Sequence, residues 1–176
     1  MRKHHLLKTM LLLCALIVGS SSVWADAEVV TLWSEDFSSF SKDAVPSGGT
    51  YKYSCGGANT KIYEETLAGG KSPELLLQKN SAGTFTATIP LDNIDGDLTL
   101  TFKTNNQKIK VETTTTGLTG GLEEKASGTH TATFKGVTTS TPSITIKFTC
   151  TGSSNVRLDD IVLTGTKASG APTLIS

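Results

Sequence analysis

Residues 144–150 read Ile-Thr-Ile-Lys-Phe-Thr-Cys, so apolar side chains alternate with threonine and lysine at every second position. Successive side chains on a β-strand point to opposite faces, so this period of two predicts a strand with one buried and one solvated face. Threonine suits the solvated face because its β-branched side chain is compatible with extended backbone. The same alternation recurs in four further stretches: 84–89, 98–103, 109–112 and 132–135.

Four shorter stretches with a weaker pattern add expected strands, at 29–33, 51–54, 61–63 and 74–78. Glycine-rich segments that favour turns separate the strands, among them Gly69-Gly70, Asp95-Gly96 and Gly120-Gly121. No stretch carries helical periodicity over a substantial length. The fold class that follows is all-β, with two antiparallel sheets packed face to face as a β-sandwich.

The first 25 of the 176 residues have the three parts of a secretory signal. A basic start precedes the apolar run at 10–18, and Val23-Trp24-Ala25 places small side chains where a signal peptidase cleaves. That run is too short for a membrane span, which needs about 20 residues. We therefore expect a secreted or outer-surface protein, with the periplasm as an alternative. Lipidation at Cys14 is a rival interpretation, but Leu13 before it is not small.

Three segments follow from this interpretation: a signal peptide at 1–25, a β-sandwich domain at 26–166, and a linker or the start of a truncated following domain at 167–176. Without the signal peptide the chain keeps 13 basic and 16 acidic residues. This weakly acidic balance gives no electrostatic basis for binding nucleic acid. Two cysteines remain, Cys55 and Cys150, and both a disulfide and a buried free thiol at Cys150 are compatible with the sequence.

The last expected strand changes phase in its middle. In residues 155–165, Asn-Val-Arg-Leu-Asp-Asp-Ile-Val-Leu-Thr-Gly, the apolar positions move from even to odd numbers at Asp159-Asp160. A slip of one residue inside a strand predicts a β-bulge. Two adjacent carboxylates there need a cation, an arginine or backbone donors as partners.

Three motifs carry a resemblance to a known group of proteins. They are LWSEDFS at 32–38, IPLDNIDGDLTLTFK at 89–103 and NVRLDDIVLTG at 155–165. Together they resemble jelly-roll domains of secreted Bacteroidetes proteins, which are similar to galactose-binding-like and carbohydrate-binding modules. The resemblance covers residues 29–165. It implies a jelly-roll sandwich, an exported location and a non-catalytic role, often beside other extracellular domains.

The resemblance also implies a structural calcium ion where the first and last strands meet. Its ligands would be Glu35 or Asp36 from the first motif and Asp159 from the last. Calcium favours several oxygen ligands, which these carboxylates would supply. The alternative is that Asp159 caps backbone amides or pairs with Arg157 or a lysine.

Catalytic patterns are weak in this sequence. The part after residue 25 has one histidine, His130, whose phase places it with Ala132 and Phe134, and no Gly-x-Ser-x-Gly motif is present. We therefore expect no enzymatic activity. Glycan binding usually needs an aromatic platform, and the candidates are Tyr51, Tyr53 and Tyr63, with packing in or beside the core as the alternative.

The sequence thus favours an exported, non-catalytic binding module for a glycan, with a possible structural calcium. Two other functions remain open. One is a structural or adhesion spacer domain in a cell-surface protein, and the other is an accessory domain of a secreted hydrolase.

Overall fold

A computed structural model describes residues 27–169, which contain β-strands and no helix. Residues 27–168 form one compact unit. The strands are β1 (Val29–Glu35), β2 (Ser54–Gly56), β3 (Lys61–Tyr63), β4 (Glu74–Leu77), β5 (Thr84–Pro90), β6 (Gly96–Thr113), β7 (Thr119–Val137), β8 (Ser143–Cys150) and β9 (Val156–Thr166).

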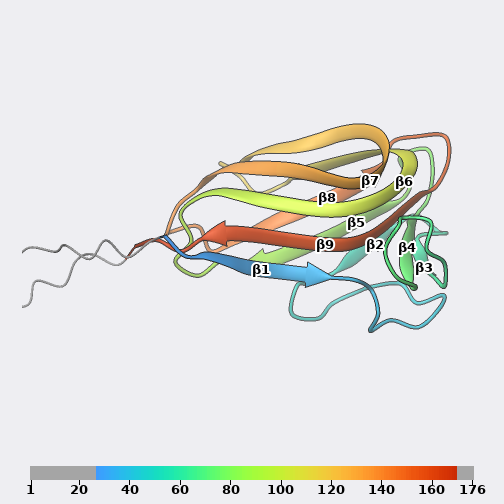
Figure 1. The fold of residues 1–176 in the computed structure, drawn as a ribbon, viewed down its shortest axis with the longest axis horizontal. Helices are drawn as coiled ribbons and strands as arrows, with labels where there is room; N and C mark the ends of the chain where they lie inside the picture. Colours follow the sequence, from blue (N-terminus) through green and yellow to red (C-terminus); the bar gives the residue numbers. More distant parts are fainter. Residues whose placement is uncertain (1–26, 170–176) are drawn as a thin grey trace, which may run out of the picture. The chain divides into compact units, whose positions relative to one another are not determined.

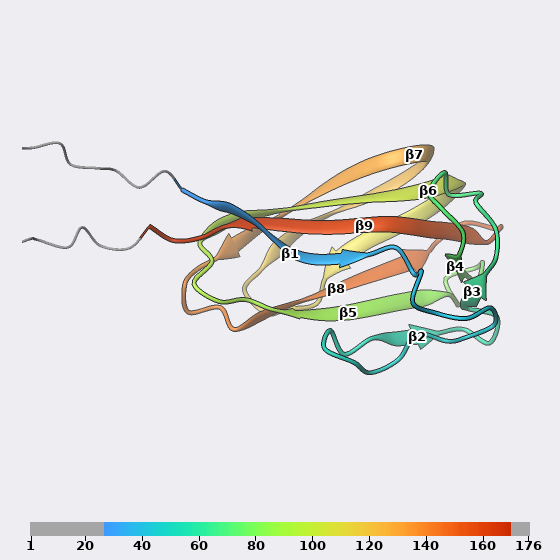
Figure 2. The same cartoon turned by 60° about the horizontal axis from the view of Figure 1, so that its bottom comes forward.

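The strands form two antiparallel layers (Figures 1 and 2). In one layer β9 pairs with β1 and β4 on one side and with the first part of β6 on the other, while β3 extends β4. In the second layer β2, β5, β8 and the last part of β6 lie in that order. Strand β7 follows β6 across both layers.

Strand β6 belongs to both layers because a bulge turns it from one to the other. The pairing of β6 with β7 shifts register between Thr104 and Gln107. Before this point Leu98, Leu100 and Phe102 face the core, and after it Ile109 and Val111 do. The extra residue reverses the phase of the alternation while the strand continues. The sequence predicted two separate strands here, and the structure joins them.

Chain order alternates between the layers, from β4 to β5, from β5 to the start of β6, and from β8 to β9. This alternation is the pattern of a jelly roll, which wraps two sheets around one core. The predicted fold class, an antiparallel β-sandwich of jelly-roll type, is therefore confirmed.

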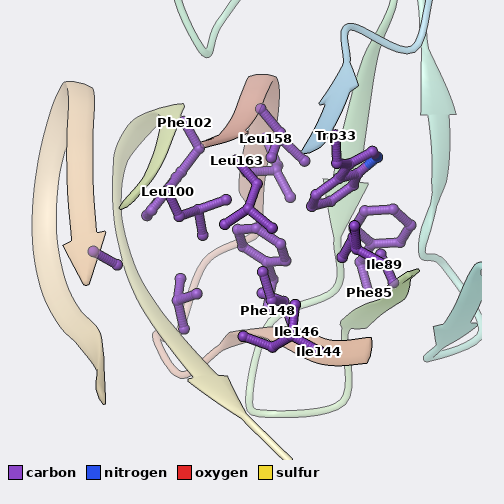
Figure 3. Packing of buried hydrophobic residues seen from close by; sticks show 14 of the residues in the cluster. Trp33, Phe85, Ile89, Leu100, Phe102, Ile144, Ile146, Phe148, Leu158 and Leu163 are labelled. Carbon is purple, nitrogen blue, oxygen red and sulfur yellow. The ribbon is translucent and has the colours of Figure 1, made fainter. Parts of the chain in front are cut away.

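The core lies between the two layers (Figure 3). Phe148 of β8 stands at its centre, with its ring 6.0 Å from that of Phe85 and 5.4 Å from that of Phe102. Phe85 and Phe148 come from one layer and Phe102 from the other. The alternation that predicted the strands thus also predicted which side chains meet in the core.

Two local predictions were wrong. The stretch 51–54 was expected as a strand, but β2 begins only at Ser54, and Lys52 before it has a positive φ of 47°. Gly120-Gly121 was expected as a turn but lies inside β7. A Cβ at Gly121 would lie 2.1 Å from the carbonyl oxygen of Val111, so this glycine permits a close approach of two strands.

Cys55 and Cys150 are both free thiols. Cys150 is buried and its Sγ donates to the Ser154 carbonyl at 3.1 Å. Burial raises the pKa of the Cys55 thiol to about 12. The buried-thiol alternative for Cys150 therefore describes this structure.

The signal peptide, Cys14 and most of the predicted 167–176 tail lie outside the described residues, and these remain predictions. Within the described range, no helix is both long and apolar enough to span a membrane.

Candidate functional site

The bulge predicted at Asp159-Asp160 is present in β9. The pairing of β9 with β6 shifts register between Thr101 and Lys103, and Asp160 has a positive φ of 46°. The bulge turns the two carboxylates in different directions. Asp160 accepts a hydrogen bond of 2.7 Å from Lys103 Nζ, whereas Asp159 is fully buried.

The Asp159 carboxylate has no hydrogen-bond partner on either oxygen within residues 27–169. Burial raises its pKa to about 7, and the nearby charges of Asp160, Glu74 and Asp36 add to the rise. The main-chain amide of Asp160 opposes this rise but does not reach hydrogen-bond geometry. A buried carboxylate without donors is costly, so this position calls for a proton or a cation.

A glycine loop lies directly against Asp159. A Cβ built on Gly70 would stand 1.9 Å from Asp159 Oδ2, so no side chain other than hydrogen fits there. Lys103 Nζ donates to the carbonyl of the preceding Gly69 at 3.3 Å and thereby ties the loop to the bulge. The sequence identified Gly69-Gly70 only as a turn, and nothing in its local pattern indicates this contact.

The other two predicted calcium ligands lie at the end of β1. Glu35 accepts hydrogen bonds of 2.7 Å from the Phe37 amide and from the Tyr53 hydroxyl. Asp36 accepts from the Ser38 hydroxyl at 2.6 Å and from the Ser38 amide at 3.0 Å, which lowers its pKa.

Asp36 lies close enough to Asp159 for its charge to act on that carboxylate. The described chain contains no group of three or more His, Cys, Asp or Glu side chains arranged to hold a metal ion. The calcium site therefore stays a prediction, with Asp159 as its unsatisfied member.

Tyr51 and Tyr53, two of the three predicted glycan contacts, pack against Trp33 at the margin of the core. Their rings lie 6.1 Å and 6.2 Å from that of Trp33. Trp33 Nε1 donates to the Tyr53 hydroxyl at 2.9 Å, and that hydroxyl in turn donates to Glu35. Burial and the Glu35 contact raise the pKa of Tyr53. Both rings are half-buried and hold the loop after β1 in place.

Tyr63 lies apart from this cluster, on the short strand β3. The Arg157 guanidinium lies 4.5 Å from the centre of its ring, and Lys61 Nζ lies 5.3 Å away. Arg157 also contacts Glu65, and its Nη1 is buried without a hydrogen-bond partner. We call Tyr63, Arg157, Lys61 and Glu65 the Tyr63 patch.

Glu74 lies between Asp159 and the Tyr63 patch, and no pattern in the sequence singles it out. It is fully buried at the start of β4, where its Oε2 accepts from the Ala68 amide at 2.8 Å. Its Oε1 lies 3.5 Å from Arg157 Nε. A glutamate before three leucines is typical of a strand end, and only the fold shows that it faces Arg157. Arg157 therefore pairs with Glu65 and Glu74, while Asp159 is left without it.

His130 faces the core, as the alternation predicted, and is 5% exposed. Its Nε2 lies 2.8 Å from Thr104 Oγ1 and its Nδ1 lies 3.1 Å from Glu124 Oε2. Thr104 is fully buried, so this hydroxyl–imidazole–carboxylate row presents no accessible nucleophile.

No protein-family model and no curated protein matches this chain. Among solved structures, the chain is similar to the CBM22-1 xylan-binding domain of Xyn10C from Paenibacillus barcinonensis, with 12% identity and a TM-score of 0.49 over 82% of this chain and 100% of that one. It is also similar to TmCBM61 in complex with β-1,4-galactotriose, with 12% identity and a TM-score of 0.44 over 70% and 98%.

A third similarity is to a mutant of CBM29-2, a family 29 carbohydrate-binding module, with 13% identity and a TM-score of 0.42 over 80% of this chain and 87% of that one. None of the three reaches a TM-score of 0.5. They assign no ligand to this chain.

Proposed function

We propose that this chain is an exported, non-catalytic binding module that binds a glycan at the Tyr63 patch and holds a calcium ion at Asp159. The observation that carries the glycan proposal is the environment of Tyr63. This partly exposed ring lies outside the core cluster and beside Arg157, Lys61 and Glu65.

Sugar sites combine an aromatic surface with a few charged or polar groups that bind hydroxyls. The Tyr63 patch supplies both kinds of group. The exposed Glu65 carboxylate can accept a hydrogen bond from a sugar hydroxyl, while the largely buried Arg157 guanidinium packs against the Tyr63 ring. By contrast, the rings of Tyr51 and Tyr53 already pack on Trp33, and the Tyr53 hydroxyl is already bonded to Glu35.

Calorimetric titration of residues 26–176 with β-linked xylo-, manno- and galacto-oligosaccharides tests this site. We expect at least one series to bind, and Tyr63→Ala to weaken that binding at least tenfold. Tyr51→Phe keeps the ring in the Trp33 cluster and serves as the control with unchanged affinity. Equal affinity of Tyr63→Ala and the unaltered protein would remove the Tyr63 patch as the site.

The calcium proposal rests on the two unpartnered oxygens of Asp159. Their position against Gly70 and within reach of the Asp36 charge is compatible with a cation. Asp159 and Asp36 would hold the ion; Glu35, the alternative ligand from the first motif, already accepts hydrogen bonds from the Phe37 amide and the Tyr53 hydroxyl. When bound, calcium would neutralise buried negative charge and join the end of β1 to the bulge of β9.

Thermal unfolding of residues 26–176 with calcium, and then with a chelator, tests the cation site. A ligand that binds only the folded state raises the melting temperature by mass action. We expect a rise with calcium that is absent in Asp159→Ala. Asp92→Ala, a change at an exposed carboxylate in the loop before β6, is the control that keeps the rise. An unchanged melting temperature would exclude calcium at Asp159.

A further inference from the structure

Strand β7 forms an open edge of the sandwich. It runs for 19 residues and, within residues 27–169, pairs with β6 alone. It lies at the margin of the fold in both views (Figures 1 and 2). On such an edge every second residue presents its main-chain N–H and C=O outward, where another strand can pair with them.

Most of this edge carries features that discourage pairing. Glycines with positive φ interrupt it at 120, 121, 128 and 136. The pairing with β6 shifts register next to Gly136, between Gly96 and Leu98 of β6. Lysines stand at 125 and 135. Irregular backbone and lysine are common protections of edge strands.

One stretch of β7 lacks these protections. Residues 129–134 pair with 98–103 of β6 without any shift of register. They contain no Asp, Glu, Lys or Arg, and their one histidine, His130, is buried. Thr129, Thr131 and Thr133 lie on the solvated face, while Ala132 and Phe134 face the core. These β-branched and aromatic residues favour the extended backbone of a β-strand that pairs with another strand.

A strand that joins this edge must repeat the pattern of threonine on one face and apolar side chains on the other. The same stretch of a second copy meets this requirement. Residues directly opposite each other in an antiparallel pair have side chains on the same face. The two-fold axis must therefore lie midway between the two copies of one residue, which pair with each other. An axis through Thr131 sets Thr129 opposite Thr133 and His130 opposite Ala132.

This register also avoids a conflict of charge. With the axis at Thr131, Lys135 lies opposite Ser127. With the axis at His130, Lys125 would lie opposite Lys135, and like charges across a strand pair are destabilising. An axis at Ala132 would extend the pairing toward the irregular backbone at Gly136.

From this we infer that β7 is a dimerisation edge, at which a second copy pairs antiparallel through residues 129–133 around a two-fold axis at Thr131. The layer of β1, β9, β6 and β7 then continues across the dimer. Because one strand pair is a small interface, association is reversible and depends on concentration.

Sedimentation velocity of residues 26–176, from about 1 to about 500 µM, tests the inference, since this range brackets weak association. We expect the sedimentation coefficient to rise with concentration. Thr131→Lys and Thr131→Glu each bring like charges together at the axis and should stay monomeric. An equimolar mixture of the two variants should dimerise again, because opposite charges then meet.

The matched control is Thr99→Lys, an exposed position on the same face of β6, directly beside Thr133. It should dimerise like the unaltered protein. Circular dichroism establishes that each variant is folded. The inference is overturned if the unaltered protein remains monomeric throughout, if Thr131→Lys still dimerises, or if the mixture of folded variants does not.

Discussion

At the scale of single residues, the ionisation of Asp159 couples the stability of the fold to pH. Its pKa is about 7 in the folded chain against an ordinary value of 3.8. A raised pKa means that the folded state favours the protonated form. Stability is therefore greatest below about pH 4 for this group and is lost as the pH rises through 7.

In chelator, we expect the free energy of unfolding to fall by roughly 2–4 kcal/mol across that range on account of Asp159. Asp159→Asn carries no titrating group and should lack this part of the slope. Urea midpoints measured at several pH values for both proteins give the comparison. If the urea midpoints of the two proteins change with pH by the same amount, Asp159 is hydrated or paired in solution and the prediction is wrong.

Gly70 gives a second prediction at this scale. A methyl group there would overlap Asp159 Oδ2, so Gly70→Ala should destabilise the fold by roughly 1–3 kcal/mol and abolish the response to calcium. Gly48→Ala is the matched control, since its φ of 65° imposes strain but no atom lies within 4 Å of the added carbon. It should lose a similar stability and keep the calcium response in thermal unfolding.

At the scale of elements, the bulge in β6 takes up one extra residue between two apolar stretches of the strand. Deletion of Asn106 would remove the extra residue and leave Thr104 and Gln107 in regular pairing with Gly128 and Ala126, so Ile109 and Val111 would still face the core. Ile109→Lys instead places a charge in that buried phase and leaves the bulge untouched. We expect the deletion variant to be folded, and Ile109→Lys to be unfolded or insoluble, by circular dichroism and solubility assays. Deletion of Ser153, in the exposed loop before β9, should leave a folded protein.

The strands also show which parts of the fold can be predicted from the sequence. Period-two alternation located β5, β8 and β9, and the phase slip at Asp159 located the bulge. The same reasoning missed the continuity of β6, because a strand with a bulge between two phases resembles two strands. It placed a turn at Gly120-Gly121, because a glycine needed for close approach looks the same as one needed for a turn.

The candidate site was harder to predict than the strands. Asp159 was found because its neighbour breaks the alternation. Glu74 and Gly70 were not found, because their roles arise from contacts with β9 that are distant in sequence. The half-burial of Tyr51 and Tyr53 likewise depends on Trp33, which lies 20 positions before Tyr53.

At the scale of the whole molecule, the two layers share one core and should unfold together. Phe148 contacts Phe85 in its own layer and Phe102 in the other. Phe148→Ala should therefore cost about 3–5 kcal/mol. We expect one transition in urea, with coincident curves from tryptophan fluorescence and circular dichroism. Separate transitions would show that the layers are stable independently.

The pairing of β1 with β9 fixes where tension would enter this domain. Val29 lies opposite Thr166, so the described chain enters and leaves at one end, while the bulge and the Tyr63 patch lie toward the other. A force that pulls Val29 and Thr166 apart would break the hydrogen bonds of this antiparallel ladder one after another, starting from that pair. Such a geometry resists pulling far less than one in which all bonds of the ladder are sheared at once. The domain therefore presents the Tyr63 patch at the end away from Val29 and Thr166. It resists a force applied between those two residues poorly.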